Sequence, residues 1–245
     1  MTAIAALVGI NTGYLALAFL PPIIWLLFYL REDAHPEPKL LLLLSFVGGM
    51  ISAIVAVAAE ILFVGKEAMI ALQAGNDRTA LVVFLAIALI EEYAKYAAIK
   101  FLVMRRKEFD EPVDAMIYMM TAALGFAALE NVLFTFPLFR ENLFLGLEVA
   151  TNRFLGANLL HALSSGIVGF FLARAFFSPH RHYFVGIGII VATVLHALFN
   201  YLILIREAIP QGTFYIILLL STMAVMVLID FERLKGKPQS PKIGV

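Results

Sequence analysis

The stretch Leu81-Val-Val-Phe-Leu-Ala-Ile-Ala-Leu-Ile-Glu91-Glu92-Tyr-Ala-Lys95-Tyr-Ala-Ala-Ile-Lys-Phe-Leu-Val103 decides the fold class of this chain. It exceeds the roughly 20 apolar residues that a helix needs to cross a bilayer, yet it holds two adjacent carboxylates and a lysine near its centre. A charged side chain at that depth costs about 2.5–3.5 kcal/mol on insertion scales. Ionisable groups that persist inside a membrane segment despite this cost indicate a functional site.

The composition of the whole chain is that of a membrane protein. Of its 245 residues, 62% are hydrophobic and only 15% are charged, whereas a soluble domain has about 25% charged residues. The 18 basic and 18 acidic residues balance, so the net charge gives no indication of nucleic acid as a partner and we expect none. The chain has no Cys, which excludes disulfides, thiol nucleophiles and Cys-based metal sites.

Seven apolar segments predict an all-α fold, a polytopic integral membrane helix bundle of about seven to eight transmembrane helices. The segments are residues 3–30, 40–64, 80–103, 113–137, 153–177, 183–205 and 212–230. Short polar connections separate them, among them Lys66–Thr79 and Leu138–Asn152. Because no linker or clear repeat divides the chain, we expect residues 1–245 to form a single transmembrane domain without a separate soluble domain.

The distribution of basic residues predicts how the bundle is oriented. Twelve of the 18 Lys and Arg residues fall on one side of the predicted spans and five on the other, with Lys95 inside a span. Lys66 and Arg78 belong to the poorer side, and Lys237 and Lys242 belong to the richer side. Since cytoplasmic loops are enriched in basic residues, we expect the N-terminus outside and the C-terminus in the cytoplasm.

Four consecutive segments carry polar side chains at helical spacing. Besides Glu91, Glu92 and Lys95, they contribute Phe126, Glu130, Asn131, His161, Ser165, His196 and Asn200. Residues four apart share a helix face. At 1.5 Å per residue, Glu91 lies about 15 Å below the outer end of its span, and Glu130, His161 and His196 fall near the same depth. We therefore expect one polar pocket in the outer half of the membrane.

Simpler structural explanations exist for single members of this set. Glu91 and Lys95 can neutralise each other, and a lone His, Asn or Ser in a membrane often only bonds a neighbouring helix. Carboxylates near span ends, namely Glu60, Asp114, Glu148 and Asp230, are expected at the interface. Small residues, namely Gly48, Gly49, Gly125, Gly166 and Gly169, are expected to permit close helix approach. The coincidence of five ionisable groups at one depth favours a functional pocket.

These residues resemble the motifs of a known family. Glu91-Glu92-Tyr-Ala-Lys95 resembles the EExxK motif of the PrsW intramembrane proteases, and Phe126-Ala-Ala-Leu-Glu130-Asn131 resembles their FxxxEN element. The pairs His161…Ser165 and His196…Asn200 resemble the HxxxS and HxxxN/D elements, and Asp33–Lys39 resembles the acidic first loop. The resemblance covers roughly residues 25–205.

A more distant similarity is to the type II CAAX prenyl endopeptidases and the related ABI-type membrane proteases, which have EExxxR, FxxxH and HxxxN motifs. This chain departs from them, because Lys95 stands one position before their Arg and Glu130 stands where they have His. The PrsW resemblance implies an intramembrane endopeptidase of a bacterial or archaeal plasma (inner) membrane. Its substrates would be single-pass membrane proteins, such as anti-sigma factors.

Hydrolysis of a peptide needs an activated water, a stabilised oxyanion and a proton for the leaving amine. Without a Cys, a GxSxG elbow or an HExxH helix, a carboxylate base is the simplest choice. We expect Glu91 or Glu92 to be that base, with Glu130 sharing a proton. Lys95 would keep a carboxylate charged, and His161, His196 and Asn200 would orient the water or stabilise the oxyanion. Asn131, Ser165 and Phe126 would support them.

Other readings of the same residues stay open. No cofactor is favoured, but Glu91, His161 and His196 could hold Zn²⁺ and leave a fourth position open. Buried Glu, His and Lys also serve proton relays, so a proton-coupled transporter is a second class. A third class is an inactive scaffold that binds transmembrane helices. The absence of repeat symmetry argues against the transporter, and the intact acidic pair argues against the scaffold.

Overall fold

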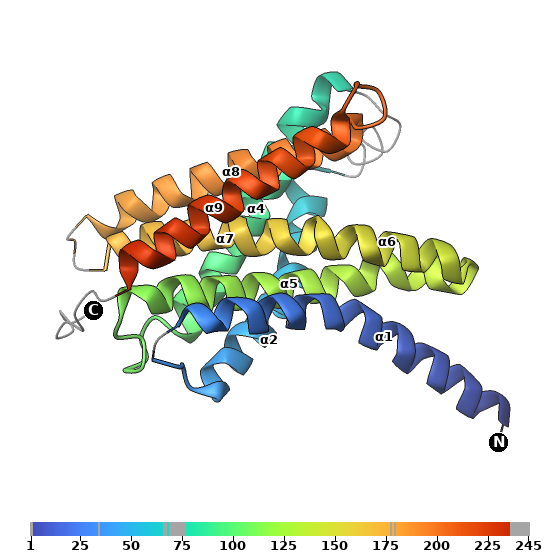
Figure 1. The fold of residues 1–245 in the computed structure, drawn as a ribbon, viewed down its shortest axis with the longest axis horizontal. Helices are drawn as coiled ribbons and strands as arrows, with labels where there is room; N and C mark the ends of the chain where they lie inside the picture. Colours follow the sequence, from blue (N-terminus) through green and yellow to red (C-terminus); the bar gives the residue numbers. More distant parts are fainter. Residues whose placement is uncertain are drawn as a thin grey trace.

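The structure is a computed structural model that describes residues 2–33, 35–65, 68, 77–176, 178 and 180–235, and helices are the only regular secondary structure in these ranges. The helices, in chain order, are α1 (Thr2–Tyr29), the short 3₁₀ helix η1 (Leu30–Glu32), α2 (Lys39–Phe63), α4 (Asp77–Leu102), α5 (Pro112–Glu141), α6 (Leu143–Leu155), α7 (Ala157–Arg174), α8 (Arg181–Ile205) and α9 (Gly212–Leu234). Figure 1 shows them as one elongated bundle.

The all-α membrane fold predicted from the sequence is confirmed. Within the described ranges, six helical segments are long and apolar enough to cross a membrane, and they correspond to six of the seven predicted spans. The remaining predicted span is α4, which has 26 residues but carries Glu91, Glu92 and Lys95 in its middle. At 1.5 Å per residue α4 is about 39 Å long, which exceeds the roughly 30 Å hydrocarbon core.

The connection predicted at 138–152 is wrong, because this segment is helical. Helix α5 continues to Glu141 and α6 begins at Leu143, so that only Asn142 lies between them. The Asn142 side chain accepts hydrogen bonds from the backbone N–H groups of Phe144 (2.8 Å) and Leu145 (3.3 Å) and thereby caps α6. This cap lets α6 run back along α5 (Figure 1), and the span predicted at 153–177 begins ten residues earlier, at Leu143.

Two sequence predictions concern residues that the structure does not describe. Most of the connection predicted at 66–79 lies outside the described residues, and so do Lys237 and Lys242, which contribute to the predicted orientation. The orientation of the bundle in the membrane remains a prediction.

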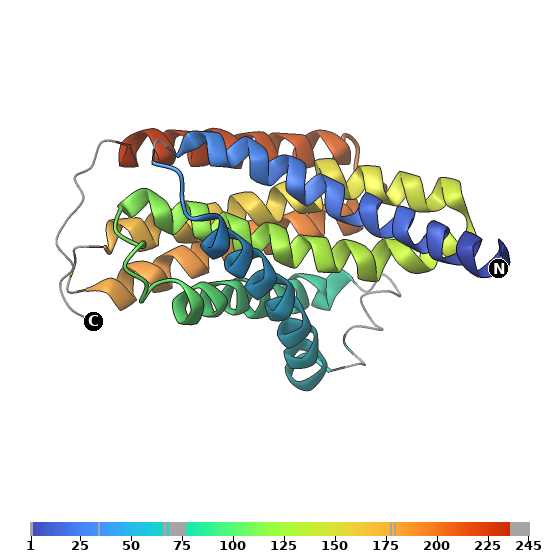
Figure 2. The same ribbon diagram turned by 90° about the horizontal axis from the view of Figure 1, so that it is seen from below.

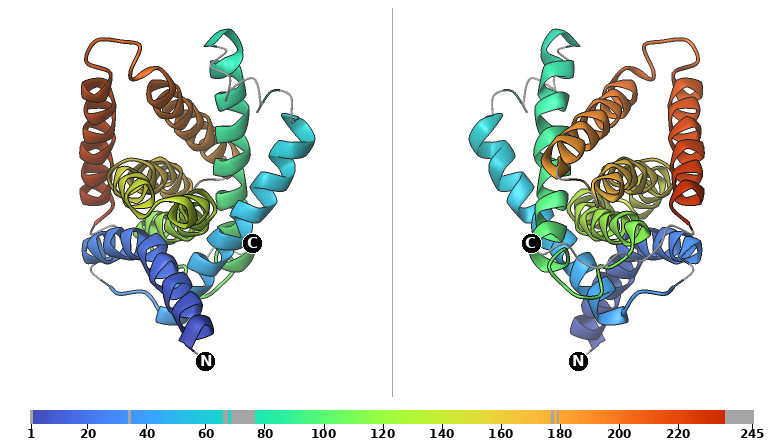
Figure 3. Two further views of the ribbon diagram at one scale, coloured as in Figure 1. Left: turned by 90° about the vertical axis from the view of Figure 1, so that its right-hand side faces the viewer. Right: turned by 90° about the vertical axis from the view of Figure 1, so that its left-hand side faces the viewer.

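Helices α5 and α7 form the centre of the bundle. Every residue from Glu111 to Ala128 is buried, as is most of α7. Seen end-on in Figure 3, α1, α2, α4, α8 and α9 surround this central pair. Apolar side chains such as Leu62 and Phe63 are exposed on the outside, as expected for a surface in contact with lipid. The bundle thus buries its polar groups and turns its apolar side chains outward.

Helix α2 crosses α5 at a backbone contact that only glycine permits, and Figure 2 shows its oblique course across the bundle. A Cβ atom on Gly49 would lie 1.9 Å from the carbonyl oxygen of Ala122, and one on Gly125 would lie 1.9 Å from that of Phe46. The close approach expected from these glycines is confirmed. The crossing matters for the site, because α5 carries Glu130 and α2 forms part of the cavity wall.

A cluster of acidic residues fixes the loop between α1 and α2 to the start of α5. The Tyr118 hydroxyl donates a hydrogen bond to the Glu37 carboxylate. Asp114 is also within hydrogen-bonding reach of Glu37, and its Oδ2 accepts from the backbone N–H groups of Asp110 (2.9 Å) and Glu111 (2.8 Å). Burial, with the negative charge of Asp114, raises the pKa of Glu37 from its ordinary value of 4.5 to about 8.

We predict that Gly49→Val and Gly125→Val each lower the free energy of unfolding by about 1–3 kcal/mol, because the added atoms force two backbones apart. The measurement is the melting temperature of the purified protein in detergent. Gly186→Val is the control, since a Cβ at Gly186 meets no atom within 4 Å. Equal melting temperatures for all three variants would contradict the close crossing.

We predict that rising pH destabilises the protein through Glu37. The folded state holds the Glu37 proton up to about pH 8, whereas the unfolded chain releases it near its ordinary pKa. The folded state therefore binds more protons between these values, and the free energy of unfolding falls as pH rises across this window.

The test for Glu37 compares melting temperatures of the wild type and Glu37→Gln from pH 5 to pH 8.5. The wild type should lose stability relative to the variant, whose side chain does not titrate. Glu148→Gln, at an exposed carboxylate, serves as the matched control and should follow the wild type. Parallel pH curves for the wild type and Glu37→Gln would refute the role of Glu37.

Candidate active site

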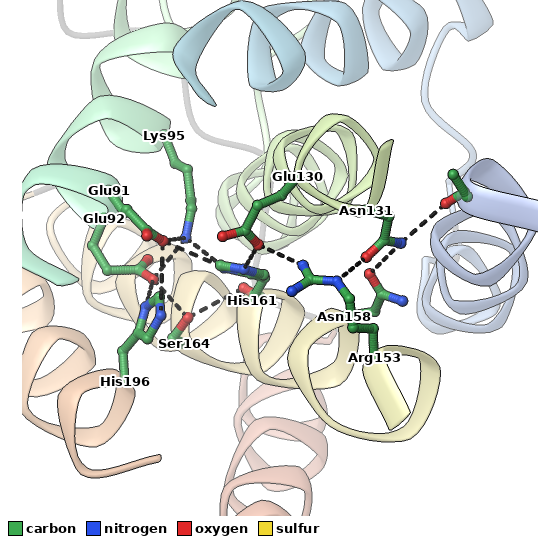
Figure 4. Close-up of polar contacts among 11 residues, drawn as sticks. Glu91, Glu92, Lys95, Glu130, Asn131, Arg153, Asn158, His161, Ser164 and His196 are labelled. Atoms are coloured by element: carbon green, nitrogen blue, oxygen red, sulfur yellow. Dashed lines mark hydrogen bonds and ion pairs between the residues drawn. The ribbon is translucent and has the colours of Figure 1, made fainter. Parts of the chain in front are cut away.

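Four helices bring most of the predicted polar residues into contact (Figure 4). The residues that meet are Glu91, Glu92 and Lys95 of α4, Glu130 of α5, His161 and Ser165 of α7, and His196 of α8. On α4 the three charged residues fall on adjacent turns, so their side chains face α7 and α8 together. The expectation that these side chains share one level of the bundle agrees with these contacts.

Glu92 is the most completely bonded of the three carboxylates. Its side chain is fully buried. Its Oε1 accepts from Lys95 Nζ (2.9 Å), His196 Nδ1 (2.9 Å) and Ser164 Oγ (2.8 Å), and its Oε2 accepts from Ser165 Oγ (2.9 Å). Both oxygens of this carboxylate are thus bonded to side chains. Glu92 holds the side chains around it in place, and it is fully buried and does not line the cavity described below.

Glu130 is held by a second network that extends to α1. Its Oε2 lies 2.7 Å from Arg153 Nη2 and 2.8 Å from His161 Nε2. Arg153 Nε donates to Asn131 Oδ1 (2.6 Å), and Asn131 Nδ2 donates to the Ala18 carbonyl and to Asn158 Oδ1, both at 3.0 Å. The network orients one oxygen of Glu130 and leaves Oε1 without a hydrogen bond to the described residues.

The hydrogen bonds assign donor and acceptor roles to the ring nitrogens that they join. A charged Lys95 Nζ can only donate, so His161 Nδ1, 2.9 Å away, accepts and His161 Nε2 donates to Glu130. His196 Nδ1 donates to Glu92, so in a neutral ring His196 Nε2 carries the lone pair. Both of the remaining nitrogens lie near the same atom, Glu91 Oε2, at 3.8 Å from His161 Nδ1 and 3.7 Å from His196 Nε2.

This arrangement fits a divalent metal ion. Glu91 Oε2 is buried and makes no hydrogen bond to any residue that the structure describes, and the ligand atoms of Glu91, His161 and His196 all lie within 4.8 Å of one another. Each imidazole donates its other N–H to a carboxylate, which is the usual support of metal-binding histidines. A Glu with two His is also a ligand set of catalytic zinc. The Lys95 ammonium group, with Nζ 3.7 Å from Glu91 Oε2, already supplies one positive charge next to these three residues.

A cavity of about 710 Å³ opens next to these residues. Glu91, Glu130, His161 and His196 form its polar wall, and apolar side chains form most of the rest. Asn200 also lies on the wall but has no hydrogen bond to the described residues, so the structure does not bring it into the network. Phe126 lines the cavity with its ring centroid 4.5 Å from Lys95 Nζ.

Three residues of the networks escaped the sequence predictions. Ser164 bonds Glu92, Asn158 bonds Asn131, and Arg153 bonds Glu130. The apolar pattern makes Arg153 the first residue of the span predicted at 153–177, whereas it lies near the end of α6 and points into the bundle (Figure 4). Lys95 stands out in the sequence because it is a charged residue inside an apolar helix. The same signal would have identified Arg153 if the segment from Leu143 had been taken as helical.

Comparison with known proteins agrees with the motifs. Residues 37–229 match the model of the family described as PrsW family intramembrane metalloprotease. The chain is 34% identical over 181 residues to Protease PrsW of Geobacillus kaustophilus (strain HTA426), which covers 74% of each chain. It is 25% identical over 210 residues to Protease PrsW of Clostridioides difficile (strain 630), covering 83% of this chain and 85% of that protein.

A third relative is Protease PrsW of Bacillus subtilis (strain 168), 29% identical over 178 residues, which cover 72% of this chain and 75% of that protein. No solved structure matches the chain significantly. The family resemblance predicted from the motifs is confirmed.

We predict that the two adjacent glutamates differ in their effect on stability. Glu92→Gln removes the charge that compensates Lys95 in a fully buried network and should lower the free energy of unfolding by about 3–5 kcal/mol. Glu91→Gln should change it by about 1 kcal/mol or less, because Glu91 Oε2 has no hydrogen bond to lose. Thermal melts in detergent measure both. The prediction fails if Glu91→Gln is as destabilised as Glu92→Gln.

Proposed function

This chain belongs to the PrsW family and is an intramembrane protease, and we propose that it hydrolyses peptide bonds where Glu91, His161 and His196 converge. The observation that carries this proposal is the position of one nitrogen of each imidazole within 3.8 Å of Glu91 Oε2 at the wall of a cavity, where that oxygen has no hydrogen bond to the described residues. Acceptors that are buried inside a membrane-spanning bundle need either a cation to bind or a water that donates hydrogen bonds to them.

We propose that these three residues hold a divalent metal ion, with Zn²⁺ as the first choice. When bound, the ion supplies Lewis acidity that activates water and polarises a peptide carbonyl. Glu92 and Glu130 keep His196 and His161 in the required tautomers through the hydrogen bonds to their outer nitrogens.

Other side chains of the cavity supply the proton transfers and the oxyanion contacts of this proposal. Glu130 Oε1 is free to accept a proton from the attacking water and to pass it to the leaving amine as the C–N bond breaks. Arg153, 2.7 Å from the other oxygen, keeps Glu130 oriented. The Asn200 side-chain amide on the cavity wall is a donor for the oxyanion.

One observation favours a second mechanism without metal. Lys95 Nζ lies 2.9 Å from His161 Nδ1, the atom that a metal ion would require. In this alternative the ammonium group is the only cation of the site, and Glu91 is the base that takes a proton from water. His196 and Asn200 then stabilise the oxyanion. The reaction and the residues at the cavity are the same, and only the source of positive charge differs.

The proposed substrates are single-pass membrane proteins, and anti-sigma factors are the class that the PrsW resemblance implies. Lateral entry suits such substrates, because the cavity lies among membrane-spanning helices α2, α4, α5 and α8. The basic-residue bias supports an outside N-terminus and a cavity in the outer half of the plasma membrane, so we expect cleavage near the outer face.

We predict that Glu91→Gln and His196→Ala each lower cleavage of single-span substrates by at least about 10²-fold, as measured on protein purified in detergent. Glu148→Gln, at an exposed position, should retain full activity. A chelator should abolish cleavage by the wild type, and added Zn²⁺ should restore it. Cleavage that survives chelation but vanishes in Glu91→Gln would select the metal-free mechanism, and full activity in Glu91→Gln would refute both.

A further inference from the structure

Glu60 is a further carboxylate of the cavity, and its surroundings differ from those of Glu91 and Glu130. It lies on α2, three residues before the helix ends at Phe63, and the sequence pattern had placed it at the membrane interface. In the structure its side chain is only 7% exposed and lines the same cavity as Glu91 and Glu130. The residue therefore adds a carboxylate from α2 to the wall of the cavity that holds the candidate site.

The Glu60 side chain makes no hydrogen bond or ion pair within the part of the chain that the structure describes. Lys95 attracts the Glu60 carboxylate only through space, and Lys95 Nζ is itself bonded to Glu92 at 2.9 Å. The other charged groups of the cavity have direct partners: Glu130 is paired with Arg153 at 2.7 Å, Glu91 lies 3.7 Å from Lys95, and Arg206 lies 3.6 Å from Glu207. Among the described carboxylates that line the cavity, Glu60 is thus the one without an ion pair.

The residues that line the cavity next to Glu60 on α2, and several that line it from α4, are apolar. One turn and two turns before it on α2, Val57 and Ala53 line the cavity, and Phe84 and Ile87 line it from α4. An ionised carboxylate in such a wall is poorly solvated. A cationic group that enters the cavity would gain from meeting it, whereas an anionic group would be repelled by Glu60 and by Glu91 and Glu130 together.

We propose that Glu60 is a substrate-binding residue that selects a Lys or Arg side chain near the scissile bond. This inference rests on the proposed function, since it assumes that a peptide occupies the cavity. Transmembrane segments are commonly flanked by Lys and Arg, and a basic side chain that is drawn to the depth of the site needs an anionic partner there. Glu60 supplies this partner and fixes the position of the chain relative to Glu91.

The test uses single-span peptides that share one transmembrane sequence and carry Lys, Gln or Glu at a single position, which is moved stepwise along the segment. Each peptide bears a fluorophore, and its Kd for the full-length protein in detergent is measured on a Glu91→Gln background so that no peptide is consumed. Cleavage rates of the same peptides are measured in parallel with Glu91 intact. The protein variants are Glu60→Gln, Glu60→Asp and the matched control Glu148→Gln.

At one position the Lys peptide should bind at least about tenfold more tightly than the Gln peptide, and the Glu peptide should bind most weakly. Glu60→Gln should abolish the difference between Lys and Gln while leaving the Kd of the Gln peptide unchanged, which also shows that the variant is folded. Glu60→Asp should keep part of the preference, and Glu148→Gln should keep all of it.

Two results would overturn the inference: no preference for Lys at any position, or a preference that persists in Glu60→Gln. The parallel cleavage assay separates this inference from the proposed function. If the wild type cleaves no peptide but the Lys preference depends on Glu60, the binding role stands and the proposed function falls.

Discussion

The ion pair between Glu92 and Lys95 is the contact on which the rest of the site depends. Both side chains are fully buried, and two charges so far from water are tolerated only when nearly every donor and acceptor is used. The two hydroxyls of Ser164 and Ser165 and the ring of His196 complete Glu92, while Lys95 reaches on to His161. One pair of charges thereby fixes α4 against α7 and α8.

A division of roles among the carboxylates follows from this pair. Glu92 is bonded through both oxygens, Glu130 through one, and Glu91 Oε2 has no hydrogen bond to the described residues. Three acidic groups of the same chemical type thus differ in how many donors they meet, and the least satisfied one lies 3.8 Å from His161 Nδ1 and 3.7 Å from His196 Nε2. In the proposed function Glu91 is reactive because its Oε2 is free of hydrogen bonds to the described residues. The hydrogen bonds of Glu92 hold Lys95 and His196 in position and so keep Glu91 free.

The sequence predicted the membrane helices and much of the polar cluster because both depend on local spacing. An apolar run of sufficient length must be helical in lipid, and residues four apart must share a face. It could not predict α6, because the polar run around Asn142 looks like a loop until its capping bonds are known. Arg153 was missed for the same reason. The position of Glu60 on the cavity wall could not be predicted, because spacing along one helix does not reveal that α2 crosses the bundle obliquely (Figure 2).

Whether Glu91, His161 and His196 act together as one ligand set can be measured by X-ray absorption at the zinc edge. We expect one Zn²⁺ per chain with two imidazole nitrogens and carboxylate oxygen in its first coordination sphere, and loss of one imidazole contribution in either His161→Ala or His196→Ala. Protein that cleaves its substrates at full rate without stoichiometric metal, or a zinc spectrum unchanged by both substitutions, would contradict it.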